Sequence, residues 1–218
     1  MMDRAEYLQR WSALHGEVPP VGVVGGWLRL SYAIGRPLAA LGVRPNLITV
    51  TGLGLAGLML LPSAGGGSWP LLAVVTIVLA GLLDSLDGAV AVLSDRVSRG
   101  GAVLDATCDR LADLCFVAAL WLAGAPAGWC VVGGAVALLH EQVRATARAG
   151  GMRDVGVVTV SERPTRVIVT AAFLLGAGLY PSRAGDWATA GAVAWTAVGI
   201  IGFAQLVLVV RRRLGDLA

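Results

Sequence analysis

The sequence predicts an all-α, polytopic membrane protein with six transmembrane helices and an N-terminal amphipathic surface helix. Of its 218 residues, 56% are apolar and only 14% are charged, whereas a soluble domain of this size carries about a quarter charged residues. The mean hydropathy is +0.75, and apolar stretches of roughly 20 residues, the length that a bilayer requires, recur along the chain. We therefore expect a single membrane domain over residues 1–218 and exclude an ordinary soluble globule, a disordered chain and a coiled coil.

The segment 1–44 is predicted to be juxtamembrane and interfacial. Within it, residues 1–18 favour a short amphipathic helix, because its apolar side chains fall on one face and its charged side chains fall elsewhere. That apolar face carries Tyr7, Leu8, Trp11 and Leu14. We expect this helix to lie on the membrane surface.

The stretch 22–42 is apolar but contains Arg29 and Arg36. Two charges near a bilayer centre would cost several kcal/mol. We therefore expect this stretch at the membrane surface or packed on the bundle, with Trp27 and Tyr32 as interfacial anchors.

Residues 46–210 contain the six predicted spans, which are 46–63, 70–92, 102–123, 126–147, 164–180 and 187–210. The loops at one end of these spans are short and nearly uncharged. The loops and terminus at the other end carry Arg44, Arg96, Arg99, Arg148, Arg153, Arg163 and Arg211 to Arg213. Because arginine-rich loops stay on the cytoplasmic side, we expect a multi-pass plasma-membrane protein with both termini in the cytoplasm.

The spans contain carboxylates, which are costly inside a membrane and normally face a cavity, an ion or a partner. On the second span, Asp84, Asp87, Gly88 and Ala91 follow the spacing i, i+3, i+4, i+7 of one helix face. On the third span, the residues spaced at i, i+4 and i+8 are Gly101, Asp105 and Asp109. A short cytoplasmic turn joins the two spans, so the sequence predicts that the four carboxylates converge.

Four converging carboxylates would repel one another strongly unless cations lie between them. An all-oxygen ligand set without nearby His or Cys favours Mg²⁺ or Mn²⁺. Two such ions about 3.5–4 Å apart stabilise phosphoryl transfer, and the small residues on these faces would leave room for a substrate phosphate. The alternatives are a set of structural ion pairs, for instance with Arg110, and a proton or ion pathway.

These residues resemble a known family. The segments DSLDGAVA (84–91) and GAVLDATCD (101–109) are similar to the signature D-x2-D-G-x2-A-R-x8-G-x3-D-x3-D of the CDP-alcohol phosphotransferases. Every spacing agrees, and the family's six-helix topology resembles the one predicted above. One position departs, because Val92 stands where the family has an arginine that would help to bind phosphates or fix the following loop.

The resemblance implies a transfer of the phosphatidyl group from CDP-diacylglycerol to an alcohol, with release of CMP. It implies that Asp84, Asp87, Asp105 and Asp109 bind the metal ions and that Asp109 acts as the general base. The implied nucleotide-binding residues are Asp84, Gly88, Ala91, Gly101 and Asp105. Pro45, Asn46 and Thr49 resemble the family's P-N-x-x-T segment, which is either a helix start or a substrate contact. A homodimer is implied by the resemblance alone.

The acceptor is expected to be a phosphorylated polyol, because guanidinium groups bind phosphate well and Arg144, Arg163 and Arg166 lie near two predicted span ends. The segment 162–166 looks like the acceptor-phosphate loop of phosphatidylinositol-phosphate synthases. Thr146 stands where those enzymes have an arginine, so glycerol 3-phosphate remains an alternative to inositol phosphate. His140 and Glu141 are interpreted as a polar pair at a helix end.

Two other functions stay open at this point. A family member without catalytic activity is one, suggested by Val92, and a transporter or channel that uses the aspartates as an ion path is the other. Transporters often show broken helices and internal repeats, and the sequence has neither. We expect the lipid bilayer, CDP-diacylglycerol and the acceptor as partners, and no nucleic acid.

Overall fold

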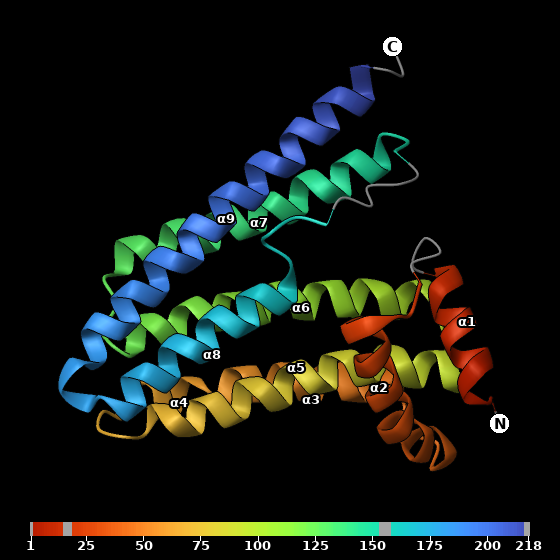
Figure 1. The fold of residues 1–218 in the computed structure, drawn as a ribbon, viewed down its shortest axis with the longest axis horizontal. Helices are drawn as coiled ribbons and strands as arrows, with labels where there is room; N and C mark the ends of the chain where they lie inside the picture. Colours follow the sequence, from red (N-terminus) through yellow and green to blue (C-terminus); the bar gives the residue numbers. More distant parts are fainter. Residues whose placement is uncertain (1, 15–18, 153–157, 216–218) are drawn as a thin grey trace. The chain divides into compact units, whose positions relative to one another are not determined.

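The computed structural model describes residues 2–14, 19–152 and 158–215, and this part of the chain contains helices and no β-strand (Figure 1). The elements in order are α1 (Arg4–Leu14), α2 (Gly22–Ala40), α3 (Pro45–Leu58), α4 (Leu60–Ser63), α5 (Pro70–Leu93), α6 (Arg99–Leu122), α7 (Ala127–Ala149), α8 (Arg163–Leu179), η1 (Pro181–Arg183) and α9 (Ala184–Gly215). The all-α class is confirmed, and each predicted span coincides with a helix or a pair of successive helices. Arg153 lies outside the described residues.

Three segments of the described chain are long and apolar enough to cross a membrane: Pro45–Ser63, Pro70–Leu93 and Pro181–Arg213. Helices α6 and α7 are of similar length but are interrupted by charged side chains, and α8 has only 17 residues. These three segments are consistent with a membrane protein, and the count of six spans stays a prediction.

The chain divides into two compact units. The first comprises Met1–Gly54 and Leu79–Asp109, and the second comprises Leu55–Val78 and Arg110–Ala218. Helices α5 and α6 are each divided between the two units. The single domain predicted over residues 1–218 stays a prediction.

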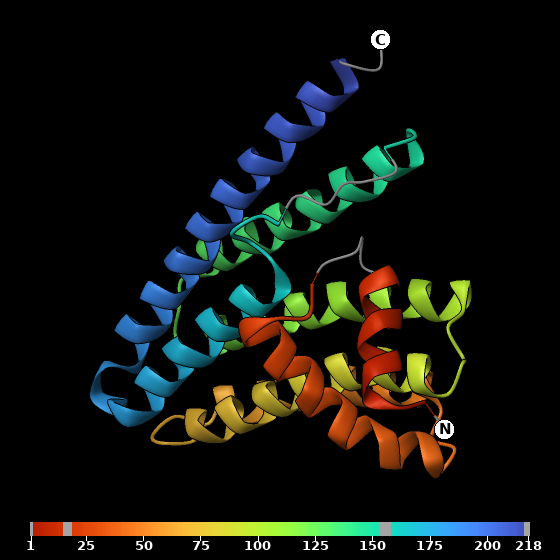
Figure 2. The same ribbon diagram turned by 45° about the vertical axis from the view of Figure 1, so that its right-hand side comes forward.

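In the first unit, α1 packs on α2 and on the C-terminal end of α5 (Figure 2). Tyr7 is only 1% exposed and is buried against Leu28 of α2 and against Ala89, Val92 and Leu93 of α5. An aromatic side chain buried in this way is a large part of a small apolar core. The apolar face predicted for this helix therefore contacts protein, and its position on a membrane surface stays a prediction.

Helix α2 also packs on α5 within the first unit. A Cβ added to Gly35 would lie 3.3 Å from a leucine side chain of α5, so the two backbones approach closely. The two predicted interfacial anchors have partners inside the unit. The Trp27 indole N–H donates to the Ser85 hydroxyl at 2.9 Å, and the ring centroids of Tyr32 and Tyr7 lie 5.5 Å apart. The stretch therefore packs on the protein, and its position at the membrane surface stays a prediction.

In the second unit, α9 runs alongside both α7 and α8 (Figure 1). Glycines allow the close approach. A Cβ at Gly133 of α7 would lie 2.8 Å from the Thr196 hydroxyl, and one at Gly191 of α9 would lie 2.7 Å from the Phe173 side chain. Small residues at helix interfaces are the usual means by which helices associate in a bilayer, where van der Waals contact replaces the hydrophobic effect.

Candidate functional site

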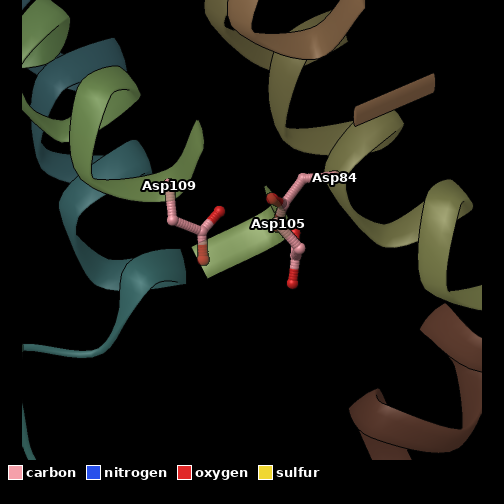
Figure 3. Close-up of side chains that lie close together, drawn as sticks. All are labelled: Asp84, Asp105 and Asp109. Atoms are coloured by element: carbon pink, nitrogen blue, oxygen red, sulfur yellow. The ribbon is translucent and has the colours of Figure 1, made fainter. Parts of the chain in front are cut away.

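Three carboxylates of the first unit converge. Asp84 extends from α5, and Asp105 and Asp109 extend from α6, so that their side chains turn toward one another (Figure 3). One oxygen from each of the three lies within 4.8 Å of the others, and all three side chains are half-buried. Carboxylates at this separation repel unless a cation screens them, which makes the group a candidate metal site.

The positions of these side chains follow from the helix period. Asp105 and Asp109 are four residues apart on α6 and therefore share a face. The turn between Leu93 and Arg99 is short, so the end of α5 and the start of α6 are neighbours in the first unit. The sequence-based prediction that carboxylates of the two helices meet is reproduced for these three residues.

Asp87 is placed differently from the other three aspartates. Its buried carboxylate accepts a 2.6 Å hydrogen bond from the Thr49 hydroxyl and a 2.5 Å bond from the Gly88 backbone N–H. Within the described residues, it is not part of the group formed by Asp84, Asp105 and Asp109. The prediction that Asp87 binds metal therefore lacks the geometric support that the other three have.

Thr49 gives the P-N-x-x-T segment a defined role. Helix α3 begins at Pro45, as the helix-start interpretation requires, and the Thr49 hydroxyl reaches across to Asp87. Asn46 and Thr49 also line a pocket of the first unit beside the carboxylates. The segment thus starts a helix and faces the candidate site, so the two interpretations are compatible.

A pocket of about 470 Å³ in the first unit opens beside the carboxylates. All five predicted nucleotide-binding residues line it: Asp84, Gly88, Ala91, Gly101 and Asp105. A Cβ added to Gly88 would meet no atom within 4 Å, so the absence of a side chain there leaves open space. The small residues on these helix faces therefore do leave room for a ligand beside the backbone.

The N-terminal helices also line this pocket, which the sequence analysis did not anticipate. Tyr7 and Trp11 of α1 and Trp27 and Ser31 of α2 are among its lining residues. The Ser31 hydroxyl is buried and has no hydrogen-bond partner in the described part of the chain, and a buried polar atom in this state is costly. The concentration of aromatic residues before residue 33 is the sequence signal for this lining, and it is equally typical of a membrane interface.

Position 92 lies in an apolar environment. Val92 is 4% exposed and packs in the core cluster with Tyr7 and Leu28. Val92 also lines the pocket beside the carboxylates, and so does the cationic Arg96, four residues further along the chain.

Charged residues of the second unit form a network of opposite charges. Arg166 of α8 is only 3% exposed, and its guanidinium donates to Asp113 of α6, to Glu141 of α7 at 2.9 Å, and to the Ser161 carbonyl at 2.9 Å. Glu141 also pairs with Arg110 at 2.8 Å. Asp113, which lies within the third predicted span, is thus held in an ion pair inside the protein.

The other two predicted acceptor-binding arginines lie in the same unit. Arg144 donates to Glu162 at 2.7 Å and is half-buried, and Arg163 opens α8. Burial opposes ionisation of Glu162, but hydrogen bonds from the Thr159 backbone N–H and from Arg144 outweigh it and lower the pKa of this carboxyl. Arg144 and Arg166 are thus held by carboxylates, and their contact with an acceptor stays a prediction.

His140 is more than a polar residue at a helix end. Its ring is fully buried, with Nε2 lying 3.2 Å from the Thr159 hydroxyl and Nδ1 lying 3.4 Å from a Glu141 oxygen. The Thr159 hydroxyl in turn donates to Glu162 at 3.0 Å. His140 therefore links α7 to the segment that precedes α8.

Comparison with known proteins relates this chain to a protein family. Residues 42–209 match the family model described as CDP-alcohol phosphatidyltransferase. The phosphatidylinositol phosphate synthase of Mycolicibacterium smegmatis is 37% identical over 163 residues, which cover 70% of this chain and 69% of that protein. The enzyme of the same name from Mycobacteroides abscessus is 32% identical over 200 residues, with 84% and 82% covered.

A solved structure shares the fold. The crystal structure of Mycobacterium tuberculosis phosphatidylinositol phosphate synthase with CDP-DAG bound matches with a TM-score of 0.67 at 26% identity. The match covers 84% of this chain and 94% of that one.

Proposed function

Because the chain belongs to the CDP-alcohol phosphatidyltransferase family, we propose that this enzyme of phospholipid biosynthesis transfers the phosphatidyl group of CDP-diacylglycerol (CDP-DAG) to the hydroxyl of an inositol phosphate and releases CMP. The observation that carries the proposal is the convergence of Asp84, Asp105 and Asp109 beside a pocket lined by all five predicted nucleotide-binding residues.

The residues present fit a divalent cation. Asp84, Asp105 and Asp109 supply only oxygen ligands, and their carboxylates come close enough for one ion to contact all three, a donor set that suits Mg²⁺ or Mn²⁺. We propose that these residues hold the metal, with Asp87 as a further ligand if its bond to Thr49 opens. When bound, two such ions neutralise the diphosphate charge and stabilise the leaving CMP.

Asp109 is the proposed general base. A carboxylate that accepts the proton of the acceptor hydroxyl makes that oxygen a better nucleophile. The new bond forms between this oxygen and the β-phosphorus of CDP-DAG, and the bond that breaks joins this phosphorus to the oxygen bridging to the α-phosphate. CMP leaves with the bonding electrons, and the phosphatidyl group remains on the acceptor.

Arg144, Arg163 and Arg166 are the proposed ligands of the acceptor phosphate. Their environments suggest different contributions. The guanidinium of Arg166 is buried and, among the described residues, uses three of its five N–H donors on Asp113, Glu141 and a backbone carbonyl, so it also fixes the start of α8. Arg144 is less buried, and an incoming phosphate would replace Glu162 as its partner.

The names of the relatives favour inositol phosphate over glycerol 3-phosphate as the acceptor. We further propose six membrane spans in the plasma membrane, an active site that faces the cytoplasm, and a homodimer. The support for the cytoplasmic orientation is the gathering of arginines in the loops at one end of the predicted spans.

The test is CMP release by the purified full-length protein in detergent. CDP-DAG and Mg²⁺ or Mn²⁺ are supplied, and inositol phosphate, glycerol 3-phosphate, inositol and serine are added singly. We expect release with inositol phosphate and none after chelation of the metal. Release with glycerol 3-phosphate alone would keep the family activity and overturn the acceptor, and no release with any acceptor would point to a family member without catalytic activity.

Arg144→Gln sharpens the assignment of the acceptor. If Arg144 binds its phosphate, the KM for inositol phosphate rises about tenfold, since a hydrogen bond to a charged group contributes about 1.5–3 kcal/mol, while the KM for CDP-DAG does not change. An equal rise in both values would show that Arg144 acts on the fold and not on the acceptor.

A further inference from the structure

The pocket beside Asp84, Asp105 and Asp109 is lined by more negative than positive charges. Asp84, Asp87 and Asp105 line it, and among the described lining residues Arg96 is the one cation. A phosphorylated ligand in such a pocket gains from a guanidinium as well as from metal ions, because a guanidinium donates two parallel hydrogen bonds to a phosphate. Among these lining residues, Arg96 is therefore the candidate for such a contact.

The turn after α5 fixes the position of Arg96. Asp95 has a φ of +54°, in the left-handed region. The Asp95 N–H donates to the Val92 carbonyl at 3.3 Å, and the Arg96 N–H donates to the Ala91 carbonyl at 2.9 Å. These two bonds form a Schellman motif, in which the residue after the left-handed one folds back against the residue whose carbonyl it binds. Arg96 is thereby held beside Ala91, a predicted nucleotide contact.

The guanidinium of Arg96 retains donors for a ligand. In the part of the chain that the structure describes, it makes one hydrogen bond, to the Gly42 carbonyl at 3.3 Å, and a guanidinium has five N–H donors. The adjacent carboxylate does not compete for it, because Asp95 pairs with Arg10 of α1. Arg96 is also exposed, so its side chain has freedom to turn toward a ligand.

Position 92 offers no cation to the pocket. Val92 packs in the apolar cluster around Tyr7, and a guanidinium at this site would need a charged partner within that cluster. The pocket also contains the buried Ser31 hydroxyl, which has no partner among the described residues and would gain one from a polar ligand. The pocket thus combines the Ser31 hydroxyl, the Arg96 guanidinium and the carboxylates of the candidate metal site.

We propose that Arg96 binds the diphosphate of CDP-DAG and supplies in this chain the positive charge that position 92 lacks. The inference rests on the proposed function, since it takes CDP-DAG as the ligand of this pocket. Arg96 acts in binding, by contact with the phosphate oxygens, and it takes no part in proton transfer.

The test compares Arg96→Gln, Arg96→Lys and the control Arg36→Gln in the full-length protein. Arg36 is an exposed arginine of α2 in the same unit that does not line the pocket. We expect Arg96→Gln to raise the KM for CDP-DAG about tenfold with little change in kcat. Arg96→Lys should fall between this variant and the wild type, because an ammonium keeps the charge but not the paired donors. Arg36→Gln should behave as the wild type.

Calorimetric titration with CDP and Mg²⁺ provides a second readout that does not depend on turnover. Weaker binding by Arg96→Gln, with an unchanged thermal midpoint, supports the proposal. Equal CDP affinity and equal KM values for Arg96→Gln and Arg36→Gln would overturn it. If the wild type releases no CMP, the proposed function fails, and the CDP titration still decides whether Arg96 binds the diphosphate.

Discussion

The two units of this protein gather charge in opposite ways. In the first unit, three carboxylates of like charge meet at Asp84, Asp105 and Asp109. In the second unit, acidic and basic side chains alternate, so that Arg166 lies between Asp113 and Glu141. Opposite charges that pair stabilise one another, whereas carboxylates at this separation repel one another and gain from a bound cation. The difference separates a group with the geometry of a metal site from a network of ion pairs that joins α6, α7 and α8.

The largest expected effect is that of Asp109→Asn. It removes the proposed base and should lower CMP release by about 10²- to 10⁴-fold. Its thermal midpoint is measured beside that of the wild type, so that a loss of activity is separated from a loss of folded protein. CMP release at the wild-type rate would exclude Asp109 as the base.

Arg166→Gln should act on stability. Removing one partner of a buried ion pair leaves an uncompensated charge and costs about 3 kcal/mol or more, so the midpoint of denaturant unfolding in detergent should fall markedly. Arg183→Gln, which changes an exposed arginine of the same unit, serves as the control. Equal midpoints for the two variants would mean that the Arg166 network contributes nothing to the fold.

Metal binding should stabilise the wild type. A ligand at 100 times its dissociation constant contributes about 2.7 kcal/mol, so Mn²⁺ or Mg²⁺ should raise the thermal midpoint of the metal-free protein. Asp84→Asn and Asp105→Asn should abolish this rise, and the exposed Asp186→Asn should keep it. A rise that survives both pocket variants would place the metal elsewhere.

The smallest effect is expected for Glu162→Gln. The pKa of Glu162 is lowered in the folded state, so its ionised form contributes stability above its unfolded pKa of about 4.3. That contribution is lost as the pH falls toward the folded value. The variant should be less stable than the wild type at pH 7 by about 1 kcal/mol, and the difference in thermal midpoint should shrink below pH 4. A difference that does not depend on pH would assign the effect to packing.

The spacing of aspartates on two helices was enough to predict most of the candidate site. Asp105 and Asp109 share a face of α6 for a local reason, the helix period, and a short turn brings α5 beside it. The role of Asp87 could not be predicted in this way, because its partner Thr49 lies 38 residues earlier in the chain. The same limit applies to Arg166, which from its sequence position resembled an open phosphate ligand and in the structure is buried by side chains of two other helices.

By itself, the sequence determined the all-α membrane class, the helix boundaries to within a few residues, and the acidic faces of α5 and α6, because composition and helical periodicity are local properties. The tertiary structure decided which charges are paired internally, that the N-terminal aromatic residues line the pocket, and that Arg96 is the cation beside Ala91. Those features depend on contacts between residues distant in the chain and on the geometry of one turn, which periodicity does not encode.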